Sequence, residues 1–539
     1  MKKGRASLGL DLSTQGVSAV VLDVDSQTRI FEHSLDYRKD PRLSIFGIRE
    51  EDYILPPTTE GEASQPPAMF FAALDAIFTD LKAAINPEDI VVINSSAQQH
   101  GHVYLNRQAH SIFQGLTGKT SADSDLVILL KGSLAYDRAP IWMTSDTEEE
   151  AEFIRDQVGG KEREIALSGS DVPLRFTGVV MRKIARQFPE VYDRTENIQL
   201  LSSLVPAILT GNSKTPIDYG NACGMSLMDY RRKCWSGALV RSVASGLPGG
   251  ETALLKKLPL LVAPDAVVGN IAAYFVRKYG FSPGCRIAAG SGDNPQSKVL
   301  VAGDLLSLGS SIVNMVSTDG QTLDMNGLAS AMYDGTGRPF IFGCRTNGAM
   351  VWDRLRAMYG LKKEEHGPAE SSLRETPVAQ NLVFWQPREE SFPPSGKLDM
   401  VRIGKETPGL GTDYAGLIET TLTSVYHHSK DFTGKTSGVL YVTGGARKSL
   451  EIIRRVAAIW NRPVTPIEEG GAALGAAVAG ASAFLKSEGD TPDMEEFIGE
   501  GLLKREPTVL PEAEDVLVFH RPGGYLDRFT AAKAKLLSG

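Results

Sequence analysis

The sequence predicts an α/β protein built from two large domains. Its 539 residues exceed the size at which a single hydrophobic core keeps growing. Strand-forming runs and runs with helical spacing are both present, and each half contains apolar strands that lead into glycine turns. This repetition suggests duplicated architecture. We expect one domain at 1–282 and a second at 283–539, because the strand pattern restarts after a turn at that point.

The first domain begins with strand-forming segments. Residues 7–13, 17–25 and 30–37 are rich in Val, Ile and Leu and are separated by turn residues, which predicts an antiparallel meander. Apolar residues at helical spacing over 69–85 predict a helix, and the apolar run at 90–94 predicts a buried strand.

The second domain repeats this style. Strands are expected within 299–317, in RPFIFGCRTNG at 338–348 and in GVLYVTGGA at 438–446, the last followed by a helix at 447–460. The Ala- and Gly-rich segment at 472–485 is about half the length that spans a bilayer, so it is predicted to be a closely packed core helix.

Composition excludes several classes of function. Hydrophobic residues at 42% and charged residues at 23% are typical of a soluble globular protein. The formal net charge of -8 argues against a broad basic face, so we expect no nucleic-acid partner. The most apolar segment is too short to span a bilayer, so we expect no membrane partner. The four cysteines lie far apart without a CxxC pair, which predicts neither a zinc site nor a disulfide framework and favours a cytoplasmic setting.

Three glycine-bearing turns are candidates for phosphate binding: GLDLSTQG at 9–16, SLGSS at 307–311 and TGGA at 443–446. Glycine turns expose backbone N–H groups that phosphate oxygens can reach, and the third is expected to open a helix as well. Hairpins and helix starts use the same residues, so each turn alone could be structural. The sequence has no GxxxxGK[ST], no GxGxxG at a strand–helix turn, no GxSxG and no HExxH.

Two aspartates stand beside such turns. Asp11 follows an apolar strand and precedes Ser13 and Thr14, so it is either a charged turn residue or a carboxylate that holds hydrated Mg²⁺ against phosphates. Asp293 lies in GSGDNP at 290–295, where it either caps a turn or performs chemistry.

Several segments together resemble the FGGY carbohydrate kinases of the actin and hexokinase superfamily. GLDLSTQGVSAVVLD resembles their first phosphate segment, SSAQQHG a sugar-contacting segment, GSGDNP the catalytic Asp segment and SLGSS a second phosphate loop. RFTG at 175–178, IDYGNACGM at 217–225, CRTNGA at 344–349, and TGGA with its helix and GGAALGAA complete the match in the family's order, so the resemblance runs from about residue 7 to 485. It implies two actin/hexokinase-like (ribonuclease H-like) domains with an interdomain catalytic cleft.

The resemblance also assigns roles to individual residues. It implies Asp293 as general base and Asp11 as the carboxylate associated with Mg²⁺. An Asp of ordinary pKa would suffice as the base, since the proton leaves late in a loose transition state. The implied sugar contacts are Gln99, His100, Arg175, Asp293 and Asn294, and the implied nucleotide contacts are Thr14, Gln15, Gly309, Ser310, Gly444, Gly445 and Ser449.

The expected activity is ATP-dependent phosphorylation of a small sugar, with ATP and Mg²⁺ required. QQHG together with GDNP is most similar to the subgroup that acts on D-xylulose. Two alternatives stay open: a kinase for another ketose or polyol, such as ribulose or glycerol, and a sugar-sensing member with weak turnover. Ser18 and Thr144 keep the second alternative open, because many members have Lys and Asp there. The oligomeric state is also open, with a homodimer among the possibilities.

Overall fold

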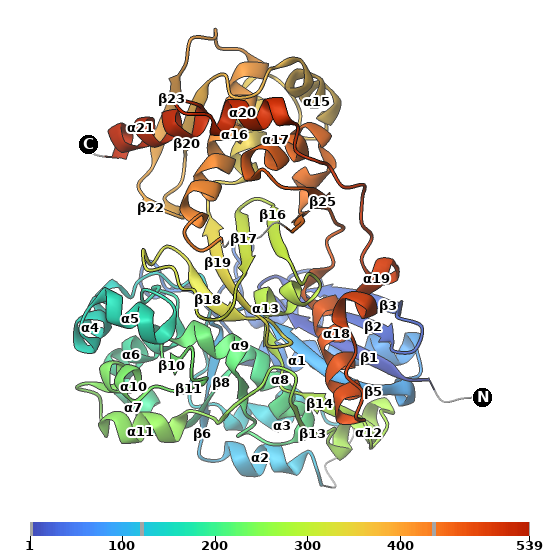
Figure 1. Cartoon of the computed structure of the whole chain (residues 1–539). Helices are drawn as coiled ribbons and strands as arrows, with labels where there is room; N and C mark the ends of the chain where they lie inside the picture. The colour runs from blue at the N-terminus through green and yellow to red at the C-terminus, as the bar shows by residue number, and fades with distance from the viewer. Residues whose placement is uncertain (1–3, 119–122, 434–437, 538–539) are drawn as a thin grey trace. The chain divides into compact units, whose positions relative to one another are not determined.

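The computed structural model describes residues 4–118, 123–433 and 438–537, and its chain forms two compact α/β units (Figure 1). Unit 1 contains Met1–Leu300, Ala331–Pro339 and Gly470–Leu502, and unit 2 contains Val301–Ser330, Phe340–Glu469 and Leu503–Gly539. The prediction of a two-domain α/β fold is confirmed. The units divide after Leu300 rather than near residue 282, because the strands after 282 complete the first sheet.

The main sheet of unit 1 begins with the expected meander. Strands β1 (Ala6–Leu12), β2 (Gly16–Asp23) and β3 (Thr28–Asp36) pair antiparallel in sequence order. On the other side of β1, strand β5 (Ile90–Ala97) pairs parallel to it, and β14 (Arg286–Ala288) and β15 (Ser291–Gly292) pair parallel to β5. Strand β13 (Val267–Asn270) completes the edge next to β14.

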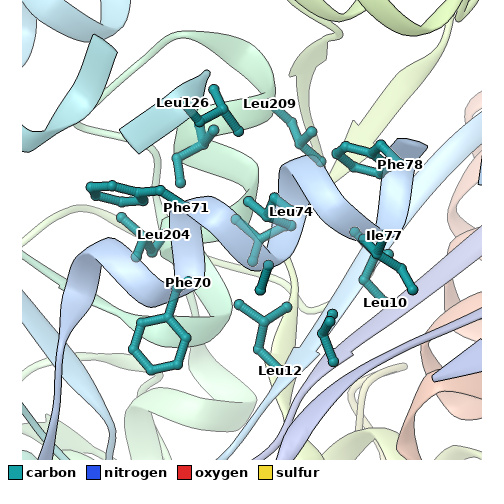
Figure 2. Close-up of a cluster of buried hydrophobic side chains, with 14 of the residues drawn as sticks. Leu10, Leu12, Phe70, Phe71, Leu74, Ile77, Phe78, Leu126, Leu204 and Leu209 are labelled. Atoms are coloured by element: carbon teal, nitrogen blue, oxygen red, sulfur yellow. The ribbon is translucent and has the colours of Figure 1, made fainter. Parts of the chain in front are cut away.

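Alternation along β1 gives the sheet two different faces. Leu8, Leu10 and Leu12 are fully buried in the large apolar core against α1 (Pro67–Ala84), and Figure 2 shows Leu10 and Leu12 beside that helix. Ser7 and Gly9 point to the opposite face, which is covered by α18 (Gly471–Ser487). A Cβ at Gly9 would lie 2.0 Å from the carbonyl oxygen of Ala473, so the helix rests on the strand backbone itself.

Helix α18 is the Ala- and Gly-rich segment, and the prediction of a closely packed core helix is confirmed. It also contacts α13 (Asp293–Val299), since a Cβ at Gly475 would lie 1.9 Å from the carbonyl oxygen of Gln296. Across the described ranges, no helix is long and apolar enough to cross a membrane.

The sheet of unit 2 has the same plan. Strands β16 (Asp304–Leu308), β17 (Ile312–Ser317) and β19 (Pro339–Arg345) pair antiparallel, while β24 (Leu440–Thr443) and β25 (Val464–Pro466) extend the sheet in parallel beyond β16. In this plan β16 corresponds to β1, and β24 corresponds to β5. The suggestion of duplicated architecture therefore agrees with the strand pairing.

The remaining elements surround these sheets. In unit 1 the other helices are α2 (Ala109–Gly115), α3 (Leu126–Leu130), α4 (Glu148–Val158), α5 (Lys161–Ser168), α6 (Thr177–Gln187), α7 (Pro189–Arg194), α8 (Leu201–Thr210), α9 (Tyr219–Ala222), α10 (Gly237–Ala244), α11 (Gly250–Lys257), α12 (Ala273–Tyr279) and α19 (Met494–Leu502). In unit 2 the helices are α14 (Ala349–Met358), α15 (His366–Glu375), α16 (Leu410–Ser429), α17 (Leu450–Trp460), α20 (Ala513–His520) and α21 (Tyr525–Leu537). The smaller strand pairs are β6 (His102–Asn106) with β8 (Thr195–Leu200), β20 (Leu382–Gln386) with β23 (Leu398–Ile403), β4 (Ser64–Gln65) with β7 (Ala139–Pro140), β9 (Ile217–Asp218) with β12 (Leu261–Val262), β10 (Met228–Asp229) with β11 (Cys234–Trp235), and β21 (Glu390–Ser391) with β22 (Pro394–Ser395).

Candidate functional site

The predicted site residues fall on both units. Unit 1 carries Asp11, Thr14, Gln15, Gln99, His100, Arg175, Asp293 and Asn294, and unit 2 carries Gly309, Ser310, Gly444, Gly445 and Ser449.

In unit 1 the predicted residues gather at the carboxyl ends of three adjoining parallel strands. Asp11 on β1 is in register with Ser96 on β5, and Ser96 is in register with Ser291 on β15. The segment that contains His100 follows β5, and Asp293 directly follows β15. The carboxyl edge of parallel strands is where α/β proteins usually bind ligands.

Asp11 and Asp293 are two buried carboxyl groups at this edge, and the pKa of each is raised. Burial raises the pKa of Asp11 to about 6, and the neighbouring Ser96 hydroxyl offsets part of that rise. Burial and the negative charge of Asp11 raise the pKa of Asp293 to about 7. An aspartate of ordinary pKa would suffice as the base, but burial and the second carboxylate nearby give Asp293 a higher pKa than that.

Backbone donors hold the Asp293 carboxylate in place. Its Oδ1 accepts hydrogen bonds from the backbone N–H of Asn294 at 2.9 Å and of Gln99 at 3.3 Å. The side-chain amide of Asn294 donates to Gln99 Oε1 at 2.8 Å, so these two predicted sugar-binding residues are hydrogen-bonded to each other. Asp293 is the first residue of α13 rather than part of a free turn. A Cβ at Gly292 would lie 2.4 Å from Cγ of Gln99, so that glycine lets the two segments close together.

His100 is buried and its ring has one fixed orientation. Its Nδ1 lies 2.9 Å from the carbonyl oxygen of Gly224, and its ring stacks on Phe176 with centroids 4.6 Å apart. Burial and the positive charge of Arg175 lower the pKa of His100 to about 3, so the ring is neutral at ordinary pH. Arg175, which precedes Phe176, therefore lies near His100.

The hairpin between β1 and β2 is tied to its neighbours by Thr14. The Thr14 hydroxyl donates to Gln98 Oε1 at 3.1 Å and accepts from the indole N–H of Trp142 at 2.9 Å. Gln15 is exposed, and its carbonyl accepts from the backbone N–H of Tyr37 at 2.9 Å. The Thr14 hydroxyl is thus already engaged in fixing the hairpin.

The two departures from the family pattern have structural partners. The Ser18 and Ser34 hydroxyls are 2.8 Å apart on paired strands. Thr144 is buried and donates to the carbonyl of Ala63 at 3.0 Å. Asp146, the carboxylate two residues after Thr144, forms an ion pair with the buried Lys183. That pairing leaves Asp146 poorly suited to take the place of a site carboxylate.

Three residues at this edge of the sheet were not predicted from the sequence to take part in the site. They are Trp142, which is 45% exposed and fixes Thr14; Phe176, which supports the His100 ring; and Asp218. Asp218 is buried and accepts a hydrogen bond from Ser291 at 2.8 Å, and burial raises its pKa to about 7. Asp218 lies in IDYGNACGM, so the segment was recognised although the residue was not.

In unit 2 the predicted glycine turns lie side by side. Gly309 and Ser310 form the turn between β16 and β17, and Gly444 follows β24. Gly444 is buried with a φ of 89°, and a Cβ there would lie 2.7 Å from the backbone of Leu308. Glycine is required at this position because it brings the two turns together.

Ser449 has a different part in this arrangement. It caps α17 by accepting from the N–H of Ile452 at 3.2 Å, and its hydroxyl donates to Glu370. The expectation that TGGA opens a helix is corrected, because Gly445–Lys448 form a 3₁₀ turn and α17 begins only at Leu450. Ser449 thereby fixes the helix that follows the glycine turn.

The Mg²⁺ prediction depends on Asp11. No cluster of three or more His, Cys, Asp or Glu side chains that could hold a metal occurs in the described part of the chain. Oδ1 of Asp11 is buried, and no described residue forms a hydrogen bond with it. One carboxylate with a vacant oxygen fits Mg²⁺, which commonly binds through one or two carboxylates plus water and substrate phosphates.

Comparison with known proteins places this geometry in context. Residues 117–299 match the FGGY family of carbohydrate kinases, N-terminal domain. The chain is 27% identical to a xylulose kinase of Schizosaccharomyces pombe over 521 residues, covering 88% of this chain and 89% of the relative. The fold is similar to crystal structures of xylulose kinase from Rhodospirillum rubrum and gluconate kinase from Lactobacillus acidophilus, each with a TM-score of 0.80 over 99% of both chains, at 17% and 16% identity.

Proposed function

Because the chain belongs to the FGGY family of carbohydrate kinases, we propose that it transfers the γ-phosphoryl group of ATP to the terminal hydroxyl of D-xylulose, giving D-xylulose 5-phosphate. The choice of sugar is supported by the relative from Schizosaccharomyces pombe, which matches over most of both chains. The fold does not favour one sugar, since the gluconate kinase structure is as similar as the xylulose kinase structure.

The observation that carries the proposal is the pair of neighbouring carboxylates, Asp11 and Asp293. A base that takes a hydroxyl proton near neutral pH works best when its pKa lies near the working pH, and that of Asp293 is about 7. In the proposed step the sugar oxygen forms a bond to the γ-phosphorus while its proton passes to the Asp293 carboxylate. The bond from the γ-phosphorus to the β–γ bridging oxygen breaks, and ADP leaves.

The sugar is proposed to bind to the residues around His100. Its neutral ring can accept a hydrogen bond from a sugar hydroxyl at Nε2, because Nδ1 is engaged by Gly224. Arg175 supplies donors beside that ring, and the linked amides of Asn294 and Gln99 supply both donors and acceptors next to Asp293.

The nucleotide is proposed to contact the glycine turns. Within unit 2, the backbone N–H groups of Gly309, Ser310, Gly444 and Gly445 are suited to phosphate oxygens. Within unit 1, those of the Thr14–Gln15 hairpin are suited to the same kind of group. Ser449 supports these contacts by capping α17. Asp11 would hold Mg²⁺, which when bound neutralises charge on the phosphates. Assembly as a homodimer is a separate proposal that light scattering can test.

The test is coupled ADP release with D-xylulose, ribulose, gluconate and glycerol as acceptors. D-Xylulose should give the highest kcat/KM. Asp293→Asn should lower kcat by about 10²- to 10⁴-fold, the usual contribution of a general base. Asp399→Asn, an exposed residue on β23, is the matched control and should leave kcat unchanged.

Each alternative has its own outcome in this experiment. Turnover of D-xylulose by Asp293→Asn at the wild-type rate would refute the proposed base. A higher kcat/KM for another acceptor would replace the substrate and retain the reaction. Calorimetric sugar binding by the wild type without ADP release above background would favour a sugar-sensing protein.

A further inference from the structure

A chain of buried hydrogen bonds leads to the backbone of His100 from the adjoining strand β6. The His102 side chain is fully buried, and its Nδ1 lies 2.9 Å from the carbonyl oxygen of His100. A ring nitrogen facing a carbonyl oxygen must carry the hydrogen, so Nδ1 donates. The other nitrogen, Nε2, then accepts from the Tyr104 hydroxyl, which lies 2.9 Å away and is also buried.

His100 adopts a backbone conformation that needs such support. Its φ is 67°, in the left-handed region that residues with a Cβ occupy at a cost of about 1 kcal/mol or more. Besides the bond from His102, its carbonyl accepts a hydrogen bond from the Thr177 hydroxyl at 3.2 Å. Two donors from different elements thus hold this peptide group in an otherwise unfavourable geometry.

The ring of His100 is held as firmly as its backbone. Phe176 covers one face of the ring, and the carbonyl of Gly224 accepts the hydrogen on Nδ1. A Cβ at Gly224 would lie 2.6 Å from Cε1 and 2.7 Å from Nδ1 of the ring, so only glycine leaves room for it there. Among the described residues, none forms a hydrogen bond with Nε2 of His100, which is therefore left as an acceptor.

We propose that His102, acting with Tyr104, is a positioning residue that fixes His100 as a hydrogen-bond acceptor toward one hydroxyl group of the sugar. The inference rests on the proposed function, since it requires that a sugar bind beside His100. It also defines the substrate class: the sugar must present a hydroxyl at this position. A keto or deoxy carbon at that position has no O–H group that could donate a hydrogen bond to the ring nitrogen.

The arrangement is stable across the pH range in which kinases are assayed. Burial lowers the pKa of His102 to about 4 and, with Arg175, that of His100 to about 3. Both rings therefore stay neutral near pH 7, and the direction of each hydrogen bond stays the same.

Three substitutions of His102 separate its two hydrogen bonds. His102→Asn keeps a donor near the position of Nδ1, His102→Gln keeps a polar group nearer Nε2, and His102→Leu removes both. We expect Gln and Leu to raise the sugar Kd and KM about tenfold, the effect of one lost hydrogen bond, and Asn to restore most of the affinity. The KM for ATP should change by less than about threefold in all three, since neither hydrogen bond of His102 involves a proposed nucleotide contact.

Gly224→Ala tests the same inference without touching His102. The φ of Gly224 is -77°, which alanine adopts without strain, so the new methyl group acts by displacing the His100 ring. Sugar affinity should fall at least about tenfold while the KM for ATP stays near the wild-type value. The matched control is His428→Asn in unit 2, where a half-buried histidine also bonds a backbone carbonyl through Nδ1. It should leave sugar affinity unchanged.

Calorimetry with D-xylulose and with its deoxy analogues, alongside steady-state kinetics, decides the outcome. Support would be a selective loss of sugar affinity in His102→Leu, rescue in His102→Asn, and one deoxy analogue that binds wild type and His102→Leu equally weakly. If the variants only lowered the melting temperature and kept the wild-type sugar Kd, this inference alone would fail. If the wild type bound no sugar, both the proposed function and this inference would fail.

Discussion

The activity should decrease as the pH falls, because Asp293 must be ionised to accept a proton. Its pKa is about 7, raised from 3.8 by burial and by Asp11. Between about pH 8 and about pH 5.5 the ionised fraction of such a group falls roughly 30-fold, whereas an aspartate with an unshifted pKa would remain almost fully ionised. We therefore expect the ionised fraction of Asp293 in the nucleotide-free protein to fall by about that factor. The value of kcat/KM for the sugar should fall in the same direction but by less, because Mg²⁺ held by Asp11 would offset the negative charge that adds to the effect of burial.

The assay is coupled ADP release at saturating ATP and Mg²⁺, with the coupling enzymes in excess at every pH. Because the phosphates of ATP also titrate near neutral pH, the Asp293 carboxyl should be followed separately by ¹³C NMR of the nucleotide-free protein, with Asp293→Asn to assign the signal. A midpoint near pH 7 is expected. A midpoint near 4, or a rate that stays flat down to about pH 5, would refute the reasoning.

Three further predictions concern other buried positions. Glu164 is fully buried, and burial raises its pKa from 4.5 to about 8. The protein therefore loses stability as the pH rises from the pKa of Glu164 in the unfolded chain toward 8, because the buried side chain must then ionise. Glu164→Gln should accordingly raise the melting temperature at pH 9 more than at pH 5. Gly444→Ala should destabilise unit 2 by about 2 kcal/mol and raise the KM for ATP more than that for the sugar, whereas Gly396→Ala, where a Cβ meets open space, should do neither. Gly475→Ala should lower both the melting temperature and kcat, because its Cβ collides with the backbone of α13, and an unchanged kcat would contradict this.

Much of the fold follows from local sequence patterns. The alternation of Leu8, Leu10 and Leu12 with smaller residues predicts a strand with one apolar face, and the structure shows that face in the core. The boundary near 282 could not be placed the same way, because the assignment of β14 and β15 to the first sheet depends on pairing with β5, nearly 200 residues earlier. Local propensity contains no information about such distant partners.

The sequence indicated which residues belong to the candidate site, but it did not indicate how buried they are or which charges lie near them. The segments that contain Asp11, His100 and Asp293 were recognisable, and the structure brings these three residues to one edge of a sheet. The pKa of Asp293 was not predictable, because it depends on burial and on the charge of Asp11. The role of Asp218 was missed for a similar reason, since its partner Ser291 is distant in sequence.

The two carboxylates depend on helix α18, whose sequence predicted close packing and to which no catalytic or binding residue was assigned. Helix α18 rests on the backbone of β1 at Gly9, two residues before Asp11, and on α13 through Gly475, at the carbonyl of Gln296 three residues after Asp293. Small residues permit both approaches, and close packing excludes water from the elements that carry the carboxylates. Exclusion of water is the main cause of the raised pKa of Asp293. Because the buried carboxyl is harder to ionise than in the unfolded chain, the free energy of unfolding decreases as the pH rises from the unfolded-state pKa of Asp293 toward 7. The Ala- and Gly-rich composition of α18 is therefore connected to the proposed chemistry, since a bulkier helix would let water reach the carboxylates and lower the pKa of the base.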